Sequence, residues 1–229
     1  DRRLTESESQ AMSFAFVFSG QGSQYVGMGT GVVDSHPLWK SHWEEVDDAL
    51  GYDLSRLVSE GPEEKLTLTE YAQPAILAYS ILLLRVLREE RPDVCAGIAA
   101  GHSLGEYSAL VAAESLAFSD ALRLVRTRGQ AMQAAVAPGV GGMLAVMGLS
   151  EPILEALCAE VGEGQLEVAA LNSPVQSVVA GPVTLLNTFS EKAVGAGARR
   201  CQPLKVSAPF HTQMLRPAGE RLREALSEV

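Results

Sequence analysis

The sequence has few cysteines and no long apolar run. Its three cysteines, Cys95, Cys158 and Cys201, are widely spaced and lack any Cys-x-x-Cys or Cys/His ligand pattern. We therefore expect reduced, buried thiols rather than a disulfide framework or a zinc site. The longest apolar stretch, around 75–84, ends at Arg85 and is far shorter than a bilayer span. No transmembrane helix and no membrane partner are expected, and reduced thiols favour the cytoplasm.

The sequence also lacks an excess of basic residues. Eighteen Lys and Arg stand against 28 Asp and Glu, which gives a net charge of −10. This charge repels a phosphate backbone, so nucleic acid is not an expected partner. With 229 residues, of which 47% are hydrophobic and 20% charged, the chain has enough apolar material for a folded core. Residues 1–13 form a polar tail that lacks the basic start and apolar centre of a secretory signal.

The first part of the chain predicts alternating strands and helices. Short apolar strands are expected at 14–18 and 96–100, and each leads into a glycine-containing loop. Helices are expected at 37–50, 71–89 and 104–113. The helix at 71–89 is apolar almost all round until Leu84, which predicts that it lies buried in the centre of a domain.

A further helix is expected from Ser119, a natural N-cap, because apolar residues recur at 122, 125, 129, 132 and 136. Arg128 lies at the margin of that apolar face. An arginine there can pack its stem and still extend its charge into a cleft.

After a break at 138–142, the order of elements changes. Strands are expected at 143–147, 166–171, 177–180 and 201–206, with helices at 151–160 and 183–196. This strand, helix, strand, strand, helix, strand order is that of the ferredoxin-like fold. The sequence thus predicts an α/β protein with two lobes. Residues 14–138 and 207–229 would form a large α/β-hydrolase-like lobe with a parallel sheet, and residues 139–206 a small ferredoxin-like (βαββαβ) lobe.

The motif Gly101-His-Ser-Leu-Gly105 fits the Gly-x-Ser-x-Gly nucleophile elbow. In an elbow, a tight turn from strand to helix exposes a strained serine at the helix N-terminus, where backbone N–H groups stabilise an oxyanion. Ser103 would be the nucleophile and the Leu104 amide an oxyanion donor. Three fixed positions also occur by chance, but the preceding apolar strand and the following helix favour the elbow.

A serine nucleophile requires a base, and the chain has four histidines. His36 and His42 flank an acidic amphipathic helix and are expected to be surface or packing residues. His102 is adjacent to Ser103 in the chain, so we expect its side chain to point elsewhere. His211 follows the last strand of the small lobe, where the chain re-enters the large lobe, and can face a cleft.

Six separated segments, taken together, carry a family resemblance. They are Phe16-Val-Phe-Ser-Gly-Gln-Gly-Ser-Gln24, Tyr71-Ala-Gln-Pro-Ala75, Gly101-His-Ser-Leu-Gly-Glu-Tyr107, Arg128-Gly129, Asn172-Ser-Pro174 and Val206-Ser-Ala-Pro-Phe-His211. In order and spacing they resemble malonyl-CoA:acyl carrier protein transacylases, including the acyltransferase domains of fatty-acid and polyketide synthases. The similarity runs from about Phe14 to Leu215. Members usually continue for several dozen residues after the last motif, so the large lobe is expected to lack its usual C-terminal part and the group that orients the histidine.

The resemblance implies a role for each matched residue. Ser103 would be acylated and His211 would act as general base and then as general acid. Gln21 would supply a second backbone N–H to the oxyanion hole beside Leu104, and Arg128 would hold the free carboxylate of malonate. The implied substrate is malonyl-CoA and the implied partner is an acyl carrier protein with its phosphopantetheine thiol, with no bound cofactor or metal.

The chemistry of the acyl group supports the role of Arg128 independently. A malonyl group differs from acetyl by one carboxylate, and the planar guanidinium pairs with a carboxylate through two hydrogen bonds. The alternative is a solvated helix arginine such as Arg123 or Arg126.

Two further residues are candidates for shaping the acyl pocket. Phe210 precedes the histidine, and a bulky aromatic there resembles malonyl-selective members, because it fills the space of an α-methyl branch. Met132 lies one helical turn beyond Arg128 and is a candidate lining residue. A core methionine is the alternative.

Other functions remain open at this level. An α/β-hydrolase shares the elbow, but its acidic residue lies between serine and histidine, and it gives no role to the Gln21 loop or Arg128. A non-catalytic carrier-docking module is a third possibility. Carrier proteins are generally acidic, so docking calls for local cations, and the candidates are Lys192, Arg199, Arg200 and Lys205.

Overall fold

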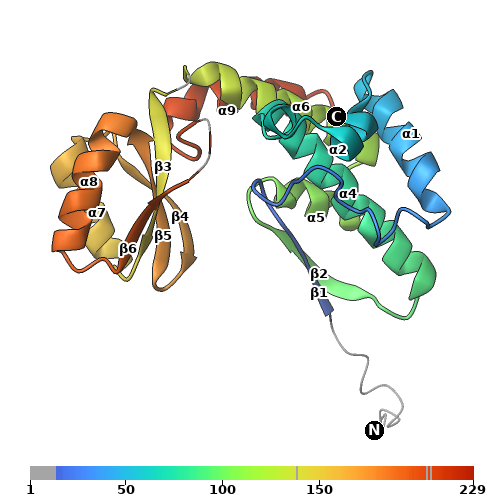
Figure 1. Cartoon of the computed structure of the whole chain (residues 1–229), viewed down its shortest axis with the longest axis horizontal. Coiled ribbons are helices and arrows are strands. Elements are labelled where there is room, and N and C mark those ends of the chain that lie inside the picture. Colours follow the sequence, from blue (N-terminus) through green and yellow to red (C-terminus); the bar gives the residue numbers. More distant parts are fainter. Residues whose placement is uncertain (1–13, 138, 205, 207) are drawn as a thin grey trace, which may run out of the picture. The chain divides into compact units, whose positions relative to one another are not determined.

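The computed structural model describes residues 14–137, 139–204, 206 and 208–229 and has a mixed α/β fold with a parallel and an antiparallel sheet (Figure 1). The chain divides into two compact units, an N-terminal unit that ends at Arg126 and a C-terminal unit that begins at Thr127. The border falls inside helix α6 (Phe118–Ala135). The predicted polar tail, 1–13, lies outside the described residues.

The N-terminal unit combines two parallel strands with helices. Its elements are β1 (Phe14–Phe18), α1 (Leu38–Leu50), α2 (Leu54–Glu60), α3 (Glu63–Leu66), α4 (Thr69–Glu90), β2 (Ala96–Gly101), α5 (Gly105–Ala112) and the start of α6. Strands β1 and β2 pair in parallel, and Phe18 lies opposite Gly101. Because parallel strands end at the same edge, the loops that follow them begin side by side.

Helix α4 forms the core of this unit. All residues from Ala72 to Ala78 are buried, as are Ile81, Leu82 and Leu84. The expectation of a central buried helix at 71–89 is therefore confirmed. Within the helix, only Leu83 and the last three residues, Arg88 to Glu90, are exposed to solvent.

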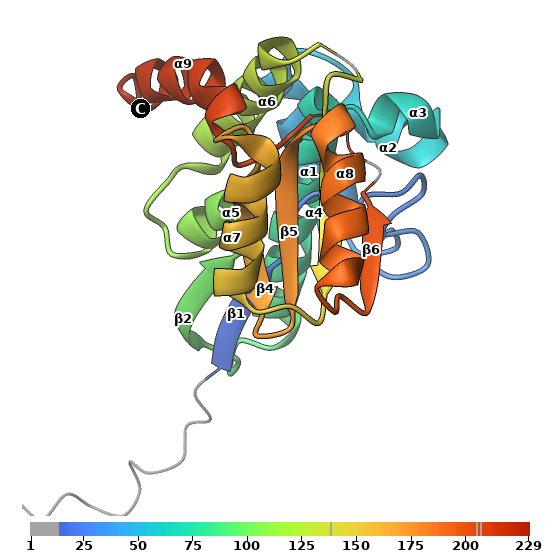
Figure 2. The same cartoon turned by 90° about the vertical axis from the view of Figure 1, so that its left-hand side faces the viewer.

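The C-terminal unit contains the antiparallel sheet. Its elements are the end of α6, β3 (Gly141–Met147), α7 (Glu151–Gly162), β4 (Glu167–Ser173), β5 (Gln176–Pro182), α8 (Val183–Gly195), β6 (Arg200–Pro203), the 3-10 turn η1 (Gln213–Leu215) and α9 (Arg216–Leu226). The strand order is β4-β5-β3-β6, and every neighbouring pair is antiparallel. Helices α7 and α8 cover one face of this sheet (Figure 2).

Alternation along the strands gives this sheet two apolar faces. Leu144 and Val179 point toward α7 and α8, where Phe189 is fully buried. The intervening residues, among them Met143 and Ala180, belong to a second cluster with Met132 of α6 and with the segment before α9. This second cluster fixes the chain around Phe210 and His211.

Two expectations from the sequence are wrong. Helix α6 begins at Phe118, so Ser119 is already inside it and is not its N-cap. The Phe118 ring is buried and stacks on His42 at 5.2 Å between centroids, which favours a helix start one residue earlier. Of the cysteines, Cys158 is buried and Cys201 half-buried, but Cys95 is exposed. It lies just before β2, and its thiol is 3.9 Å from the Pro92 carbonyl oxygen.

None of the helices in the described ranges is long and apolar enough to span a membrane.

Candidate active site

The turn after β2 holds Ser103 in a strained conformation. Its φ angle is 52°, in the left-handed region that residues other than glycine and asparagine rarely adopt. Both flanking glycines are sterically required. A Cβ at Gly101 would lie 1.9 Å from the Gly105 carbonyl carbon, and one at Gly105 would lie 2.2 Å from the Phe18 carbonyl oxygen. The sequence pattern Gly-x-Ser-x-Gly thus has a direct geometric cause, namely three backbone segments in close contact.

Helix α5 begins directly after this turn. Its first residue is Gly105, and Leu104 precedes it as the fully buried N-cap. The backbone N–H groups at this end belong to the first turn, which carries the positive end of the helix dipole. A negative charge that develops on the substrate beside Ser103 would therefore be stabilised by the backbone itself.

The loop with Gln21 lies against this turn. A Cβ at Gly20 would lie 2.6 Å from the His102 carbonyl oxygen, so the two loops are in contact. The Gln21 side chain donates a hydrogen bond of 3.1 Å to the hydroxyl of Thr69, a fully buried residue at the start of α4. This bond holds Gln21 in place and leaves its backbone for other contacts. Within the N-terminal unit, the structure thus brings the Gln21 loop, Ser103 and Leu104 together.

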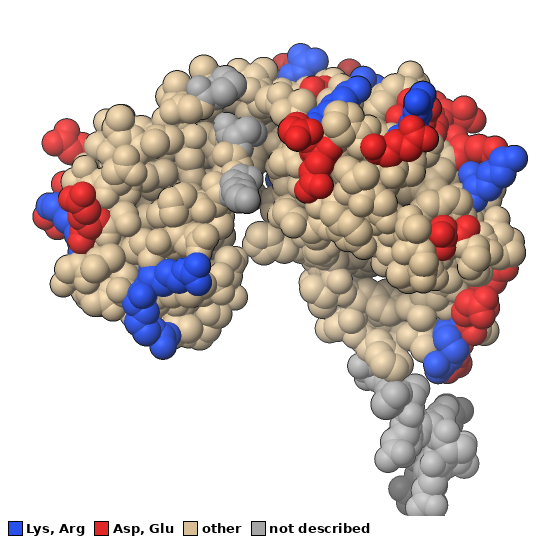
Figure 3. Space-filling view, viewed as in Figure 1, with Lys and Arg blue, Asp and Glu red and all other residues tan. Residues whose placement is uncertain are grey.

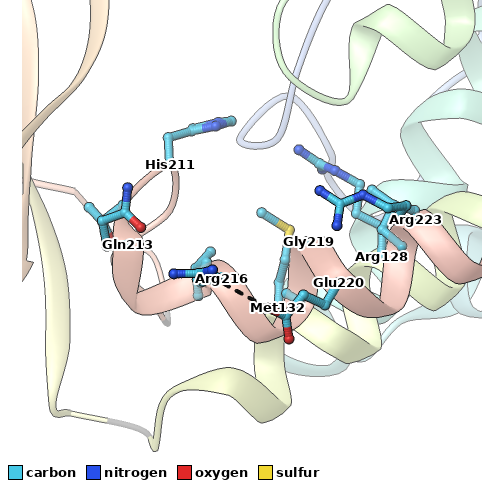
Figure 4. Close-up of a pocket in the computed structure, with 12 residues that line it drawn as sticks. Arg128, Met132, His211, Gln213, Arg216, Gly219, Glu220 and Arg223 are labelled. Atoms are coloured by element: carbon cyan, nitrogen blue, oxygen red, sulfur yellow. Dashed lines mark ion pairs between the residues drawn. The ribbon is translucent and has the colours of Figure 1, made fainter.

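The C-terminal unit contains a cavity of about 440 Å³ between α6, η1 and α9. Arg128, Met132 and His211 all line it. Figure 4 shows the His211 ring on one side of the cavity and the Arg128 guanidinium on the other. Residues that lie 83 positions apart in the chain, Arg128 and His211, therefore share one cavity.

His211 is also held in a strained backbone conformation, with φ at 62°. Four described residues other than glycine have positive φ, and two of them, Glu114 and Glu163, lie at helix C-terminal ends, where this conformation is common. Ser103 and His211 do not lie at such helix ends. Strain of this kind persists where the surrounding structure fixes it, and it concentrates at functional sites.

Neighbouring contacts hold the segment of His211. Pro209 packs on Gly141 of β3, since a Cβ there would meet its ring at 2.5 Å. The Thr212 hydroxyl donates to the Pro209 carbonyl at 2.8 Å, and the Gln213 amide donates to the Glu167 carboxylate at 2.8 Å. Sheet and turn together hold the backbone on both sides of His211, which is exposed.

Phe210 takes a different position from its neighbour. It is 7% exposed and packs in the apolar cluster that includes Met132, Met143 and Leu215. Phe210 is not among the described residues that line the cavity. Met132 contributes to both the cluster and the cavity, and its role beside the acyl group stays a prediction. The influence of Phe210 on the acyl group stays a prediction.

The other histidines have structural contacts. His42 is 2% exposed, donates through Nε2 to the Ala78 carbonyl at 2.9 Å and accepts from Arg85 through Nδ1 at 2.9 Å. Burial, helped by the positive charge of Arg85, lowers the pKa of His42 from 6.5 to about 4. His36 lies 3.4 Å from Glu90. Both are packing residues, as expected.

Comparison with known proteins agrees with this geometry. The family model for the acyl transferase domain matches residues 15–229. The chain belongs to this family. The domain is 43% identical over 217 residues to the malonyl CoA-acyl carrier protein transacylase of Haemophilus influenzae, an alignment that covers 94% of this chain and 70% of that protein. It is 45% identical over 214 residues to the enzyme of the same name from Bacillus subtilis strain 168, covering 93% and 67% of the two chains.

Solved structures match this acyl transferase domain equally well. The acyl-carrier-protein S-malonyltransferase of Burkholderia pseudomallei superposes with a TM-score of 0.89 at 46% identity, covering 95% of this chain and 71% of the other. A malonyl-transacylase solved in complex with a type II PKS acyl carrier protein gives a TM-score of 0.91 at 42% identity, covering 95% and 70%.

Three residues of the acyl transferase domain escaped the sequence reasoning. Thr69 anchors the side chain of Gln21. Arg216 and Arg223 of α9 line the cavity with Arg128. Their spacing of seven residues places both on one helix face, and this was the signal available in the sequence. Across the described part of the domain, no three His, Cys, Asp or Glu side chains are grouped as metal ligands.

Proposed function

We propose that the chain transfers a malonyl group from malonyl-CoA to the phosphopantetheine thiol of an acyl carrier protein, through an ester on Ser103. The observation that carries this proposal is the strained Ser103 turn at the start of α5, with the Gln21 loop packed against it. The relatives at 43–45% identity carry the name malonyl CoA-acyl carrier protein transacylase, which supplies the donor and the acceptor.

The reaction consists of two exchanges at one carbonyl carbon. The Ser103 oxygen attacks the thioester carbon of malonyl-CoA while the His211 imidazole takes the hydroxyl proton. The backbone N–H groups of Gln21 and Leu104 hold the oxyanion. The carbon–sulfur bond then breaks, and coenzyme A leaves as a thiol with the proton from His211. The phosphopantetheine thiol next attacks the ester and repeats these steps in reverse, which releases Ser103.

Arg128 holds the free carboxylate of the malonyl group in this scheme. Its place in the cavity with His211 supports the assignment, as does the match between a guanidinium and a carboxylate. Met132 borders the acyl group. Phe210 limits the space for an α-methyl branch from behind the cavity, so methylmalonyl-CoA is a poor donor.

The proposal also assigns a fold type to each of the two predicted lobes. The strand order β4-β5-β3-β6, with α7 and α8 on one face, supports a ferredoxin-like lobe at 139–206. The parallel β1 and β2, with the Ser103 turn between β2 and α5, support an α/β-hydrolase-like lobe in its part 14–138. The predicted share of 207–229 in that lobe has no such support, because these residues group with the C-terminal unit.

Docking of the acidic carrier protein calls for a basic surface. Figure 3 shows basic side chains gathered near the start of β6 with no acidic side chain beside them on that face. Arg199 and Arg200 lead into this strand and are exposed. Lys192 pairs with Glu160, which makes it a weaker candidate, and Lys205 lies outside the described residues. We place the reaction in the cytoplasm, because coenzyme A thioesters and reduced thiols such as that of Cys95 are typical of this compartment.

Intact-mass measurement after mixing the chain with malonyl-CoA tests the proposal. We expect a mass increase of one malonyl group on the wild type and none on Ser103→Ala. With Arg128→Ala, malonyl loading should fall by about 10- to 100-fold, because a charge-assisted hydrogen-bond pair is lost. Loading from acetyl-CoA should fall much less, and methylmalonyl-CoA should load the wild type poorly.

The same measurement separates the alternatives. A serine hydrolase would give free malonate and little persistent adduct, whereas transfer requires an ester that survives until the second thiol arrives. A non-catalytic docking module would bind carrier protein without forming an adduct. Either result contradicts the proposed function.

A further inference from the structure

The cavity beside His211 contains a second arginine that the catalytic scheme above does not use. Arg223 projects from α9 into the same cavity as Arg128, and Figure 4 shows the two guanidinium groups on the side opposite His211. They come from different helices, α6 and α9. Two cations have therefore converged on one space from separate parts of the chain.

The neighbouring arginine of α9 differs in its contacts. Arg216 pairs with Glu220, with Nε 3.5 Å from the carboxylate. Throughout the described part of the chain, no carboxylate lies within ion-pair distance of Arg223. Glu220 is the only acidic side chain among the described residues that line the cavity, and its carboxylate already pairs with Arg216. The cavity thus has three arginines against one glutamate.

This excess of positive charge is unusual for the chain. The whole sequence has a net charge of −10, yet here cations outnumber anions. Two guanidinium groups near each other repel, and they repel more strongly in a partly enclosed space than in open water. An arrangement of this kind is stabilised when an anion enters between the cations.

We infer that Arg223 is a second specificity-determining residue of the acyl pocket, which attracts the free carboxylate of the malonyl group together with Arg128. The inference rests on the proposed function for the identity of that anion. Arg128 is half-buried and forms the inner contact, whereas Arg223 is exposed and acts from the mouth of the cavity. The expected contribution is therefore smaller than that of Arg128, because solvent screens an exposed charge.

The chain offers a matched control on the same helix. Arg221 is also an exposed arginine of α9, two residues away from Arg223, but it does not line the cavity. Arg223→Met and Arg221→Met remove the same charge from the same helix. Arg223→Lys keeps the charge and shortens the donor group.

Steady-state loading with three donors tests the inference. We expect Arg223→Met to lower kcat/KM about fivefold for malonyl-CoA and equally for malonyl-N-acetylcysteamine, which has no phosphates. The loss should appear in KM rather than in kcat, because the attraction acts before and during the reaction alike. Acetyl-CoA should react unchanged, Arg221→Met should match the wild type, and Arg223→Lys should recover most of the loss.

Other patterns overturn the inference. A loss for malonyl-CoA and acetyl-CoA, with none for malonyl-N-acetylcysteamine, would mean that Arg223 binds the phosphates of coenzyme A. Equal effects of Arg223→Met and Arg221→Met, or no effect of either, would mean a general charge effect or no role.

A binding measurement separates this inference from the proposed function. Calorimetric titration with free malonate and with acetate needs no catalysis. If the wild type forms no malonyl ester but Arg223→Met still weakens malonate binding about fivefold, the anion site stands and the transfer reaction does not. If malonate binds both proteins equally while the ester forms, the transfer reaction stands and the role of Arg223 is rejected.

Discussion

At the scale of the residue, the two proposed catalytic residues share an unusual backbone conformation. Ser103 and His211 both have positive φ, at 52° and 62°. For Ser103 the two glycines of the motif predict the strained turn, because close backbone contacts exclude a Cβ at both positions. For His211 nothing in the sequence does, since Pro209 and Thr212 fix the segment through contacts with β3 and with each other. The serine turn could therefore be predicted from the sequence, whereas the conformation of His211 could be seen only in the folded structure.

The glycines around Ser103 give the first prediction at this scale. Gly105→Ala would place a Cβ 2.2 Å from the Phe18 carbonyl oxygen, so β1 and α5 have to move apart. We expect the free energy of unfolding to fall by about 1–3 kcal/mol and the rate of ester formation by at least tenfold. Urea unfolding and intact-mass kinetics measure the two effects.

Gly195→Ala is the control for this variant. Gly195 lies in the last turn of α8, and a Cβ there meets nothing within 4 Å. We expect unchanged or slightly higher stability, because alanine favours a helix over glycine. Equal behaviour of the two variants would contradict the steric explanation of the motif.

At the scale of the element, apolar periodicity predicted the long helices. It did not predict the short helices or the element ends that depend on tertiary contacts. Helix α4 was predictable from its apolar surface alone, and its buried residues match that pattern. The short helices α2 and α3 were not expected, since seven and four residues carry too little periodic signal. The start of α6 moved to Phe118 because that ring packs on His42, a contact between residues 76 positions apart in the sequence. Pairing also ended β6 at Pro203, before the predicted end at 206.

The contact between α1 and α4 gives a pH prediction. His42 of α1 is neutral in the fold, with its pKa lowered from 6.5 to about 4 by burial and by Arg85. Above pH 6.5 the histidine is neutral in both states and adds no pH dependence. Between pH 6.5 and 4 the unfolded chain takes up a proton that the folded chain does not, so stability is lost as the pH falls through this window. The expected loss is about 3 kcal/mol.

Urea unfolding of the wild type and of His42→Gln at pH 7 and pH 4.5 measures this effect. Glutamine can still donate to the Ala78 carbonyl that His42 Nε2 contacts, but it does not titrate. We expect the variant to be less stable at pH 7 and to lose distinctly less stability on acidification. The same pH dependence in both proteins would mean that other groups account for the acid sensitivity.

At the scale of the whole molecule, charge is unevenly distributed, and this bears on how an acidic chain binds an acidic carrier protein. A net charge of −10 repels such a partner at long range, so productive encounters depend on local cations. Composition predicted the repulsion but not the location of the cations, because sequence order alone does not show which basic residues are paired. Lys192 pairs with Glu160, whereas Arg199 and Arg200 make no ion pair with the described residues.

Reversing the charge of these two arginines tests the docking surface. Because like charges oppose the encounter, we expect Arg199→Glu and Arg200→Glu each to raise the KM for carrier protein about three- to tenfold and to leave the KM for malonyl-CoA unchanged. The difference from the wild type should shrink at high salt, where surface charges are screened. Lys40→Glu, at an exposed position of α1 in the N-terminal unit, changes the net charge equally but is not part of this surface and should have no effect. An equal rise in both KM values, or the same rise with Lys40→Glu, would place docking elsewhere, because total charge would then explain the result as well as position does.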